Sequence, residues 1–344
     1  MHAHRKALEA TAHEIVGEGR GILAADESTG TMTKGLEGAG IDSTEETRRR
    51  FRELLFTAEA AEEHISGVIM YDETIRQATS DGVPFPEWLA GHDMLPGIKV
   101  DTGAKPLAGA EGEKVTEGLD GLRERLEEYV EMGARFAKWR GVIAIGDGLP
   151  SRYCIAANAH ALARYAALCQ EAGVVPIVEP EVLMDGHHSI DTSEEVTRET
   201  LRAVFAELLD QRVALEGIVL KPNMVLAGYD CADQAGVEEV AERTLALLRV
   251  VVPAAVPGIT FLSGGQSDER ATAHLNAMNS IGGQPWELSF SYGRALQAAA
   301  LKSWAGEEAN VANAQAGFLH RARCNGAARL GRYSEELEKK AMAA

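Results

Sequence analysis

The sequence predicts a (β/α)8 barrel, in which eight parallel strands alternate with helices around one closed sheet. Three observations support this fold. Short apolar runs recur along the chain at intervals of roughly thirty to forty residues. Amphipathic segments with helix-capping patterns separate these runs. Ionisable and small polar residues follow the runs, which is where barrel enzymes place their active sites.

The predicted strands are short, often β-branched, and bounded by glycine or proline, which favours strands over helices. They cover residues 21–25, 65–71, 97–100, 136–139, 174–178, 217–220, 259–262 and 288–290. The last two runs are the most closely spaced, and they are therefore the weakest evidence for a total of eight strands. An open doubly wound sheet is the competing topology, but the turn after the first run lacks its GxGxxG fingerprint.

The segments between the runs carry helix signals. Ser43 and Glu46 form a capping-box pattern ahead of an apolar helical face. A second apolar stripe covers residues 119–130, and Thr192 with Glu195 opens a third amphipathic segment. Each of these segments connects two predicted strands, as a parallel barrel requires.

The composition fits one large domain. With 344 residues, 45% of them hydrophobic, the chain can bury a substantial core. We expect a single barrel domain with its core over about residues 20–305 and helical extensions at both ends, the C-terminal helix and short tail covering 306–344. The net charge of −18 argues against nucleic acid or an anionic membrane as the main partner. A phosphorylated substrate stays compatible with it, because a few focused cations can outweigh a distant acidic surface.

The cysteines, the charged N-terminal segment and the lack of a long apolar stretch indicate a cytoplasmic protein. The cysteines are widely spaced and form no CxxC motif, which suits a reducing compartment rather than disulfides or a zinc site. They are Cys154, Cys169, Cys231 and Cys324. Residues 1–20 are charged throughout, unlike a signal peptide. The longest uncharged stretch, 250–267, contains two prolines and a glycine pair, so no transmembrane helix is expected.

Lys221 ends the apolar run 217–220. An ammonium group at the end of a buried strand must reach solvent, pair with a carboxylate or perform chemistry. A desolvated amine near other cations loses its proton more easily and can act as the nucleophile of a Schiff-base enzyme. Taken alone, a lysine that extends to solvent explains the position better, so its neighbours decide between these interpretations.

Several ionisable residues follow other runs in pairs that are two positions apart. Side chains with this spacing share one face of a strand. Each pair alone is compatible with a buried ion pair, but together they predict convergence on a ligand at one end of the barrel. The pairs are Lys99 and Asp101, Lys138 and Arg140, and Glu179 and Glu181.

The ends of the last two predicted strands indicate a phosphate site. Barrel enzymes often bind phosphate on the loops after strands seven and eight. The segment Ser263-Gly264-Gly265 offers backbone N–H groups without obstruction by side chains, and Arg294 offers a bidentate guanidinium. By contrast, His187 and His188 resemble a metal loop but lack partners at ligand spacing, so no metal is expected.

These strand-end segments resemble the class I, or Schiff-base, fructose-bisphosphate aldolases. The resemblance covers about residues 14–332. It is carried by GILAADEST (21–29), GIKVD (97–101), FAKWR (136–140), VPIVEPE (175–181), LEGIVLKPNM (215–224), GITFLSGGQS (258–267) and SFSYGRALQ (289–297). It implies a barrel that reversibly cleaves fructose 1,6-bisphosphate into dihydroxyacetone phosphate and glyceraldehyde 3-phosphate, in glycolysis or gluconeogenesis. No cofactor and no metal are implied, and members are often tetramers.

The resemblance also implies roles for individual residues. Lys221 corresponds to the Schiff-base nucleophile, and Glu179 to the general acid and base that dehydrates the carbinolamine and handles the C4-hydroxyl proton. Asp26 would assist carbon–carbon cleavage, Lys138 would add positive charge beside the imine, and Glu181 would orient the lysines. The C1-phosphate would contact Ser263, Gly264, Gly265, Ser291, Gly293 and Arg294, and the C6-phosphate end would contact Ser28, Lys99 and Arg140.

Two departures from the family pattern bear on the substrate. The family usually has an arginine at the position of Gly35, which weakens the expected grip on the C6-phosphate. Animal members carry a flexible tail that ends in a tyrosine, whereas this chain has no aromatic residue after Tyr333. A related Schiff-base aldolase for fructose 1-phosphate or sedoheptulose 1,7-bisphosphate therefore remains an alternative. A non-catalytic scaffold is more remote, because Lys221, Glu179 and Lys138 are all present.

Overall fold

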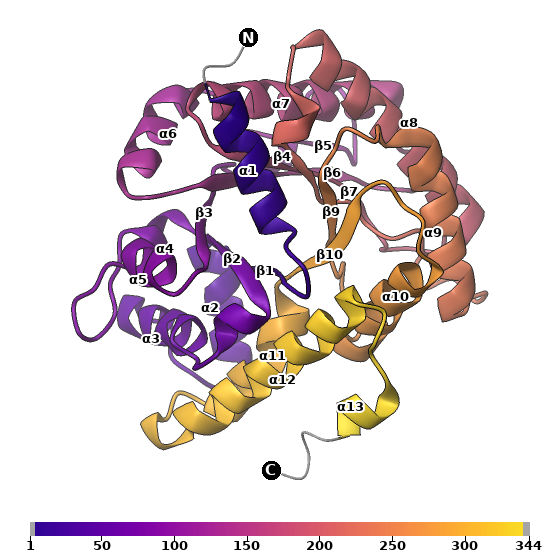
Figure 1. Ribbon diagram of the computed structural model, residues 1–344. Coiled ribbons are helices and arrows are strands. Elements are labelled where there is room, and N and C mark those ends of the chain that lie inside the picture. Colours follow the sequence, from indigo (N-terminus) through magenta and orange to yellow (C-terminus); the bar gives the residue numbers. More distant parts are fainter. Residues whose placement is uncertain (1–3, 340–344) are drawn as a thin grey trace.

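The computed structural model describes residues 4–339, and within them a closed parallel barrel is surrounded by helices (Figure 1). Around the barrel the strands follow the order β1-β10-β9-β8-β7-β6-β3-β2. The predicted (β/α)8 barrel is thus confirmed, and the open doubly wound sheet is wrong. The strands are β1 (Gly21–Ala25), β2 (Ile65–Met70), β3 (Leu95–Lys99), β6 (Phe136–Ile143), β7 (Val175–Val182), β8 (Val219–Leu220), β9 (Gly258–Phe261) and β10 (Glu287–Tyr292).

Three strands are longer than their apolar runs predict. β6, β7 and β10 continue for two or more residues past the runs 136–139, 174–178 and 288–290. The apolar pattern stops where the inward face becomes polar, but the backbone ladder continues, because its hydrogen bonds do not depend on the side chains. Catalytic candidates such as Glu179 therefore lie inside a strand and not after it. β8 is shorter than predicted, because a 3-10 turn, η2 (Leu215–Gly217), precedes it.

Helices surround the barrel, and most of them connect successive strands. They are α1 (Arg5–Ile15), α2 (Thr29–Gly38), α3 (Glu45–Phe56), α4 (Asp72–Ile75), α5 (Phe85–Gly91), α6 (Leu122–Glu131), α7 (Arg152–Glu171), α8 (Ile190–Asp210), α9 (Val237–Val251), α10 (Asp268–Ile281), α11 (Arg294–Trp304), α12 (Val311–Arg329) and α13 (Glu335–Lys339). An antiparallel hairpin, β4 (Ala104–Pro106) with β5 (Lys114–Thr116), follows β3 and was not predicted.

Two predicted helix starts are shifted. The capping box of α3 uses Thr44 and Thr47 rather than Ser43 and Glu46, because the two threonine hydroxyls each accept the other's backbone N–H. For α8, the side chain of Ser189 caps the helix by accepting the N–H of Thr192, so the helix begins before the predicted position.

The end of the barrel at which the strands begin is apolar and closed. α1 lies across the strands in Figure 1 and packs its buried side chains Leu8 and Ile15 against the barrel interior. Phe136 fills this interior, and a Cβ on Gly97 of the next strand would lie 2.3 Å from its ring, so the position requires glycine. Because this end is filled, the polar residues can gather only at the opposite end of the barrel.

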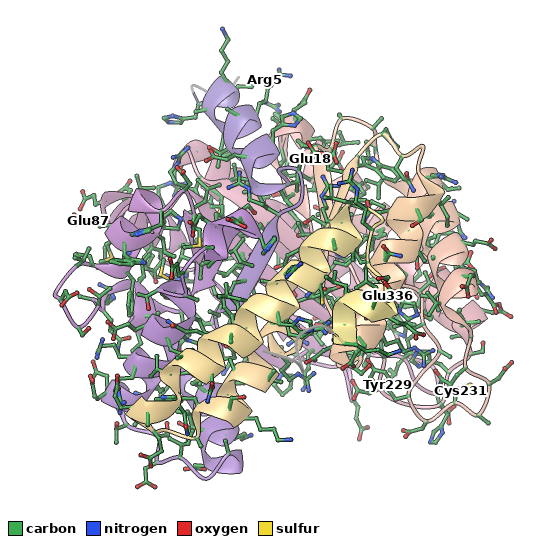
Figure 2. The ribbon with its side chains drawn as sticks, turned by 60° about the horizontal axis from the view of Figure 1, so that its bottom comes forward. Arg5, Glu18, Glu87, Tyr229, Cys231 and Glu336 are labelled. Carbon is green, nitrogen blue, oxygen red and sulfur yellow. The ribbon has the colours of Figure 1, made fainter. Side chains whose placement is uncertain are left out.

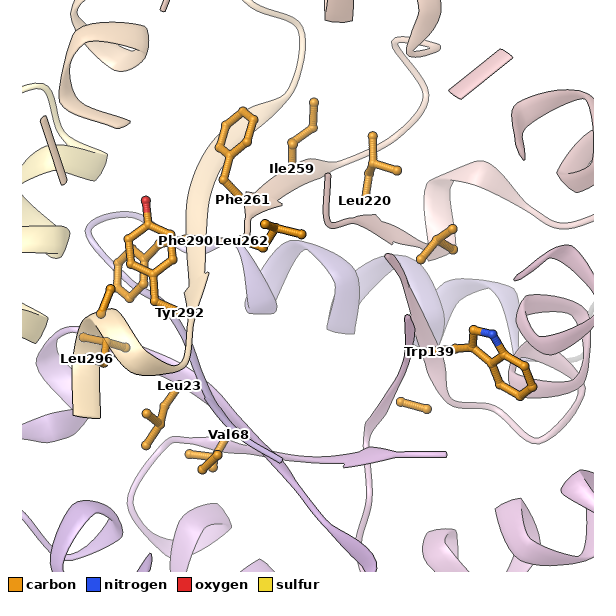
Figure 3. Close-up of a cluster of buried hydrophobic side chains, with 14 of the residues drawn as sticks. Leu23, Val68, Trp139, Leu220, Ile259, Phe261, Leu262, Phe290, Tyr292 and Leu296 are labelled. Atoms are coloured by element: carbon orange, nitrogen blue, oxygen red, sulfur yellow. The ribbon is translucent and has the colours of Figure 1, made fainter. Parts of the chain in front are cut away.

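Alternate strand residues point outward and form the layer under the helices. Figure 3 shows Val68, Trp139 and Leu220 among these buried side chains. Trp139 stacks on Tyr165 of α7 with ring centroids 5.6 Å apart. Since Trp139 faces α7, its neighbours Lys138 and Arg140 face the inside of the barrel, as the spacing predicts.

Candidate active site

A cavity of about 290 Å³ opens at the C-terminal ends of the strands. It brings together most of the residues that the sequence singled out, but Asp101 and Gly265 do not line it. Its predicted members are Asp26, Ser28, Lys99, Lys138, Arg140, Glu179, Glu181, Lys221, Ser263, Gly264, Ser291, Gly293 and Arg294. The cavity is also lined by Ala24, Glu27, Thr31 and Leu262.

At the centre of the cavity, Glu179 lies between two lysines. Its Oε1 is 3.2 Å from Lys221 Nζ, and its Oε2 is 3.2 Å from Lys138 Nζ. Lys138 Nζ also lies 2.6 Å from Asp26 Oδ2. The barrel ladder sets this arrangement, because the backbone N–H of Lys221 donates to Val178 and so brings Lys221 beside Glu179. Two cations and two anions thus form one continuous chain.

Lys221 does not reach solvent. Only 3% of the residue is exposed, and its ammonium nitrogen contacts a buried carboxylate. An extended surface lysine is therefore the wrong interpretation of this position. A buried lysine–carboxylate pair carries a large desolvation penalty, and this pair lies in the wall of a cavity. The position suits chemistry on a bound molecule.

The charges of this group set its pKa values. Burial opposes ionisation of Asp26 and Glu179, but Lys138 and Lys221 outweigh it, so the pKa of each carboxyl lies below its usual value. Burial likewise opposes the charged form of Lys138, yet Asp26 and Glu179 raise its pKa. Near neutral pH both carboxylates are therefore ionised, and Lys138 is an ammonium ion.

The lowered pKa of Asp26 predicts a pH-dependent contribution to stability. A carboxyl with a lower pKa in the folded state stabilises the protein above its unfolded pKa, and this contribution is lost as the pH falls toward the folded pKa. We expect the difference in unfolding free energy between the unmodified protein and Asp26→Asn to be constant from about pH 5 to 7 and to shrink below about pH 4. Urea unfolding at a series of pH values measures it. A difference that stays unchanged down to about pH 3 would contradict the lowered pKa.

Beside this centre lies a second charged group at the mouth. Arg140 Nε donates to Glu181, and the Lys99 Nζ to Asp101 Oδ1 distance is 3.4 Å. Glu181 thus contacts an arginine, and the orienting role toward the lysines that the resemblance implies finds no direct contact among the described residues. Glu181 lies two residues beyond Glu179 on β7, where Arg140 reaches it and the buried lysines do not.

The other side of the cavity presents groups suited to an anion. Gly293 precedes α11 and Arg294 begins it, so the helix N-terminus and a guanidinium face the same region. The hydroxyl of Ser291 is buried and has no hydrogen-bond partner among the described residues, although it lines the cavity. Gly264 has φ +60°, which favours glycine, and a Cβ there would lie 2.4 Å from Met184 Cε, so a larger residue would have to displace the methionine.

Gly265 follows Gly264 in the same loop but does not line the cavity. It has φ +96°, and a Cβ would lie 3.2 Å from Arg294 Nη2. Its side-chain position is therefore directed toward Arg294 and Tyr229, whose hydroxyl oxygen would lie 3.4 Å away. Substitution here would disturb Arg294, although the residue itself does not form the cavity wall.

Sequence reasoning missed one buried network that supports the site. Arg52 of α3 is 2% exposed and donates to Glu27 at 2.6 Å and to Gln297 at 3.0 Å. Gln297 of α11 in turn donates to the Ala24 carbonyl at 2.8 Å. The network fixes the end of β1, which carries Asp26, against two helices. The helical spacing could have indicated this, because Arg52 lies three and four positions before the buried Leu55 and Phe56 of α3.

The two histidines of the sequence that resembles a metal loop, His187 and His188, differ in their contacts. His187 Nδ1 lies 3.0 Å from the Asp230 carbonyl oxygen. His188 is half-buried, and burial lowers its pKa. Neither ring nitrogen of His188 has a hydrogen-bond partner among the described residues.

One group, His320 with Cys324 and Glu338, has the spacing of metal ligands within residues 4–339. Its carboxylate is already engaged, because one oxygen of Glu338 accepts from Arg321 and the other from Tyr333, at 2.7 Å. A guanidinium bound to the same oxygen opposes a further cation. These contacts join α13 to α12.

Known proteins resemble this chain over nearly its whole length. The sequence profile of the family described as "Glycolytic: Fructose-bisphosphate aldolase class-I" matches residues 7–344. A probable fructose-bisphosphate aldolase class 1 of Xanthomonas campestris is 60% identical over 327 residues, covering 95% of this chain and 98% of the relative. The fructose-bisphosphate aldolase of Dictyostelium discoideum is 52% identical over 332 residues, covering 96% and 93%.

A solved structure shows the same fold. Fructose-bisphosphate aldolase of Plasmodium falciparum, in a ternary complex with TRAP and a small-molecule inhibitor, superposes with a TM-score of 0.95 at 46% identity, and the match covers 96% of each chain. Among residues 4–339, no helix combines the length and the apolar character needed to cross a membrane. The profile, the relatives and the fold all point to one assignment: the chain belongs to the class I fructose-bisphosphate aldolase family.

Proposed function

We propose that Lys221 forms the Schiff base through which this chain carries out the family reaction. That reaction is the reversible aldol cleavage of fructose 1,6-bisphosphate into dihydroxyacetone phosphate and glyceraldehyde 3-phosphate. One observation carries the proposal: the buried amine of Lys221 lies 3.2 Å from Glu179 Oε1, in the wall of the cavity. A protonated imine on this lysine supplies the electron sink that cleavage beside a ketone requires.

Glu179 can serve both proton transfers of imine formation. The Lys221 amine must be neutral to attack the ketone carbon, and ionised Glu179 can take its proton. When the carbinolamine forms, the same carboxyl can return the proton to the departing hydroxyl, which leaves as water. Lys138 remains charged throughout, because Asp26 and Glu179 raise its pKa. Its positive charge would stabilise Glu179 as a carboxylate between these steps.

Cleavage then breaks the C3–C4 bond of the bound sugar. The bonding electrons move into the imine to give an enamine, and the C4 hydroxyl gives up its proton to Glu179 as the aldehyde leaves. Asp26 lines the same cavity and is held by Lys138 at 2.6 Å, so it can contact the C4 hydroxyl from a fixed position. Protonation of the enamine and hydrolysis of the imine complete the cycle.

The two phosphates fit opposite sides of the cavity. The C1-phosphate would bind at the N-terminus of α11 with Ser291, Gly264 and Arg294, where the buried Ser291 hydroxyl lacks a partner within residues 4–339. The C6-phosphate would lie toward Ser28, Lys99 and Arg140. Ser28 is the N-cap of α2, so that phosphate too would face a helix N-terminus.

Because Gly35 stands where the family usually has an arginine, we expect this chain to bind the C6-phosphate less tightly than a chain with that arginine would. It lies in α2 and lines a second cavity of about 540 Å³ that shares Glu27, Thr31 and Arg294 with the catalytic cavity. A Cβ at Gly35 meets only Leu301, at 3.9 Å, so a side chain fits. We expect Gly35→Arg to lower KM for fructose 1,6-bisphosphate by up to about 5-fold, as for one exposed charge pair, and to leave KM for fructose 1-phosphate unchanged.

Steady-state kinetics on both substrates measures this effect. Gly35→Ala is the matched control, because alanine also improves the helix but adds no charge. The same fall in KM for both substrates, or in both variants, would contradict a phosphate contact.

The substrate itself is tested by comparing turnover of fructose 1,6-bisphosphate, fructose 1-phosphate and sedoheptulose 1,7-bisphosphate. We expect the highest kcat/KM for fructose 1,6-bisphosphate, because Ser28, Lys99 and Arg140 offer a second phosphate site. Equal turnover of fructose 1-phosphate would contradict the bisphosphate preference. Activity in excess EDTA should be unchanged, since the imine takes the place of a metal as electron sink.

We further propose that the chain works in the cytoplasm as a single-domain homo-oligomer, a tetramer by family analogy. A similar aldolase of Arabidopsis thaliana, 53% identical, bears the name "cytosolic", and the cysteines of this chain are free. Light scattering coupled to size-exclusion chromatography gives the mass of the assembly. A mass of about 37 kDa at micromolar concentration, that of the 36.9 kDa chain, would contradict an oligomer.

A further inference from the structure

The loops after three neighbouring barrel strands meet at one tyrosine. Tyr229 follows β8, the strand that leads to Lys221, and its backbone N–H donates to the Met184 carbonyl after β7 at 2.9 Å. Its hydroxyl donates to the Gly264 carbonyl after β9 at 2.7 Å. The backbone N–H of the preceding residue, Gly228, donates a hydrogen bond to the His188 carbonyl oxygen at 2.8 Å. Tyr229 therefore connects the phosphate loop, residues 263–265, to the segment after β7, which carries Glu179, and itself belongs to the segment that β8 leads into through Lys221.

The hydroxyl of Tyr229 is a dependable donor. Burial raises its pKa to about 12, so it stays protonated near neutral pH. It also lies 3.3 Å from the sulfur of Met184, whose terminal carbon packs closely on Gly264. Figure 2 places Tyr229 near Cys231 at one edge of the molecule, and 44% of the residue is exposed. Its ring thus covers the phosphate loop from the outside.

The hydrogen bond from Tyr229 to the Gly264 carbonyl fixes the orientation of the peptide between Gly264 and Gly265, beside the cavity. In a trans peptide the carbonyl of one residue and the N–H of the next point in opposite directions. With the Gly264 carbonyl held by Tyr229 on the outside, the Gly265 N–H points the other way. Both flanking residues are glycines with positive φ, and glycine has little intrinsic preference between backbone conformations, so an external contact helps to fix the orientation of this peptide.

We propose that Tyr229 is a positioning residue for the C1-phosphate: it orients the Gly264–Gly265 peptide and keeps it beside Arg294. Arg294 Nη2 and the Tyr229 hydroxyl both lie close to the Cβ position of Gly265, at 3.2 and 3.4 Å. This inference rests on the proposed phosphate site. It assigns Tyr229 no contact with the reacting carbons, so substrate binding should depend on it and chemistry at Lys221 should not.

The test is Tyr229→Phe, which removes only the hydroxyl, assayed in the condensation direction. Dihydroxyacetone phosphate carries the phosphate that becomes the C1-phosphate, and glyceraldehyde 3-phosphate carries the other. We expect KM for dihydroxyacetone phosphate to rise roughly 2- to 12-fold, the range for one hydrogen bond. KM for glyceraldehyde 3-phosphate and kcat should change less than about twofold. Tyr153→Phe is the matched control, because Tyr153 is exposed on α7 and does not line the cavity.

The outcomes separate the possible failures. An unchanged KM for dihydroxyacetone phosphate in Tyr229→Phe would overturn the positioning role, as would an equal rise for both substrates. A purely structural role would lower kcat through loss of folded enzyme and leave both KM values in place. Borohydride trapping of dihydroxyacetone phosphate on Lys221 should persist in the variant. Failure of trapping in the unmodified protein would instead contradict the proposed function.

Discussion

Replacing Lys221 by arginine is expected to abolish cleavage of fructose 1,6-bisphosphate while the barrel stays folded. Arginine keeps the positive charge beside Glu179, 3.2 Å from the lysine nitrogen it replaces, so the buried carboxylate keeps a partner. A guanidinium does not lose its proton and cannot form an imine. We expect kcat to fall by at least about four orders of magnitude, as for loss of a covalent nucleophile. A coupled assay of triose phosphate release measures it.

Lys99→Arg is the matched control for this variant. Lys99 lines the same cavity and pairs with Asp101 at 3.4 Å, and its proposed contribution is charge alone. Its kcat should stay within about tenfold of the unmodified enzyme. Near-normal circular dichroism in both variants establishes folding. Residual activity of Lys221→Arg above about 1% would mean that another residue forms the covalent bond.

Replacing Lys138 by methionine has the second largest expected effect. Lys138 separates Asp26 and Glu179, at 2.6 and 3.2 Å, and lowers the pKa of both carboxyls. Without it, two buried carboxylates share one remaining ammonium, so their pKa values rise. We expect kcat to fall by roughly 10²- to 10⁴-fold. Loss of one partner from the buried group should also reduce unfolding free energy by about 3–5 kcal/mol.

The pH profile distinguishes this role from simple destabilisation. If catalysis needs Asp26 and Glu179 ionised, raising their pKa values moves the acidic limb of the kcat–pH profile to higher pH. Lys138→Arg retains the charge and should keep the limb near its original position. An acidic limb that does not move in Lys138→Met would show that Lys138 does not control these carboxyls.

The fold could be predicted because its signals are local and repeated. Apolar runs bounded by glycine and proline identified each barrel strand. The alternation of side chains along a strand correctly predicted that Lys138 and Glu179 point into the barrel. The lengths of the strands were predicted less well, because β6 and β7 continue beyond the position where apolar residues give way to polar ones. Helix starts were also misplaced, since several hydroxyls near Thr44 and Ser189 compete as caps.

The sequence predicts which residues form the site, but not which of them contact one another. The sequence indicates which side chains share one end of the barrel, yet it does not show that Glu179 contacts both lysines while Glu181 contacts Arg140. Pairings depend on strand stagger, which decides how deep each residue lies. The contact between Tyr229 and Gly264 joins two loops, and loop conformation follows no periodic pattern.

The identity of the nucleophile is the central claim, and borohydride reduction tests it most directly. The enzyme is incubated with dihydroxyacetone phosphate, the imine is reduced, and the modified peptide is located by mass spectrometry after proteolysis. A single adduct on Lys221 is predicted, because its amine lies beside Glu179 in the wall of the cavity. An adduct on Lys138, or no adduct in an enzyme that still turns over, would contradict the Schiff-base mechanism proposed for Lys221.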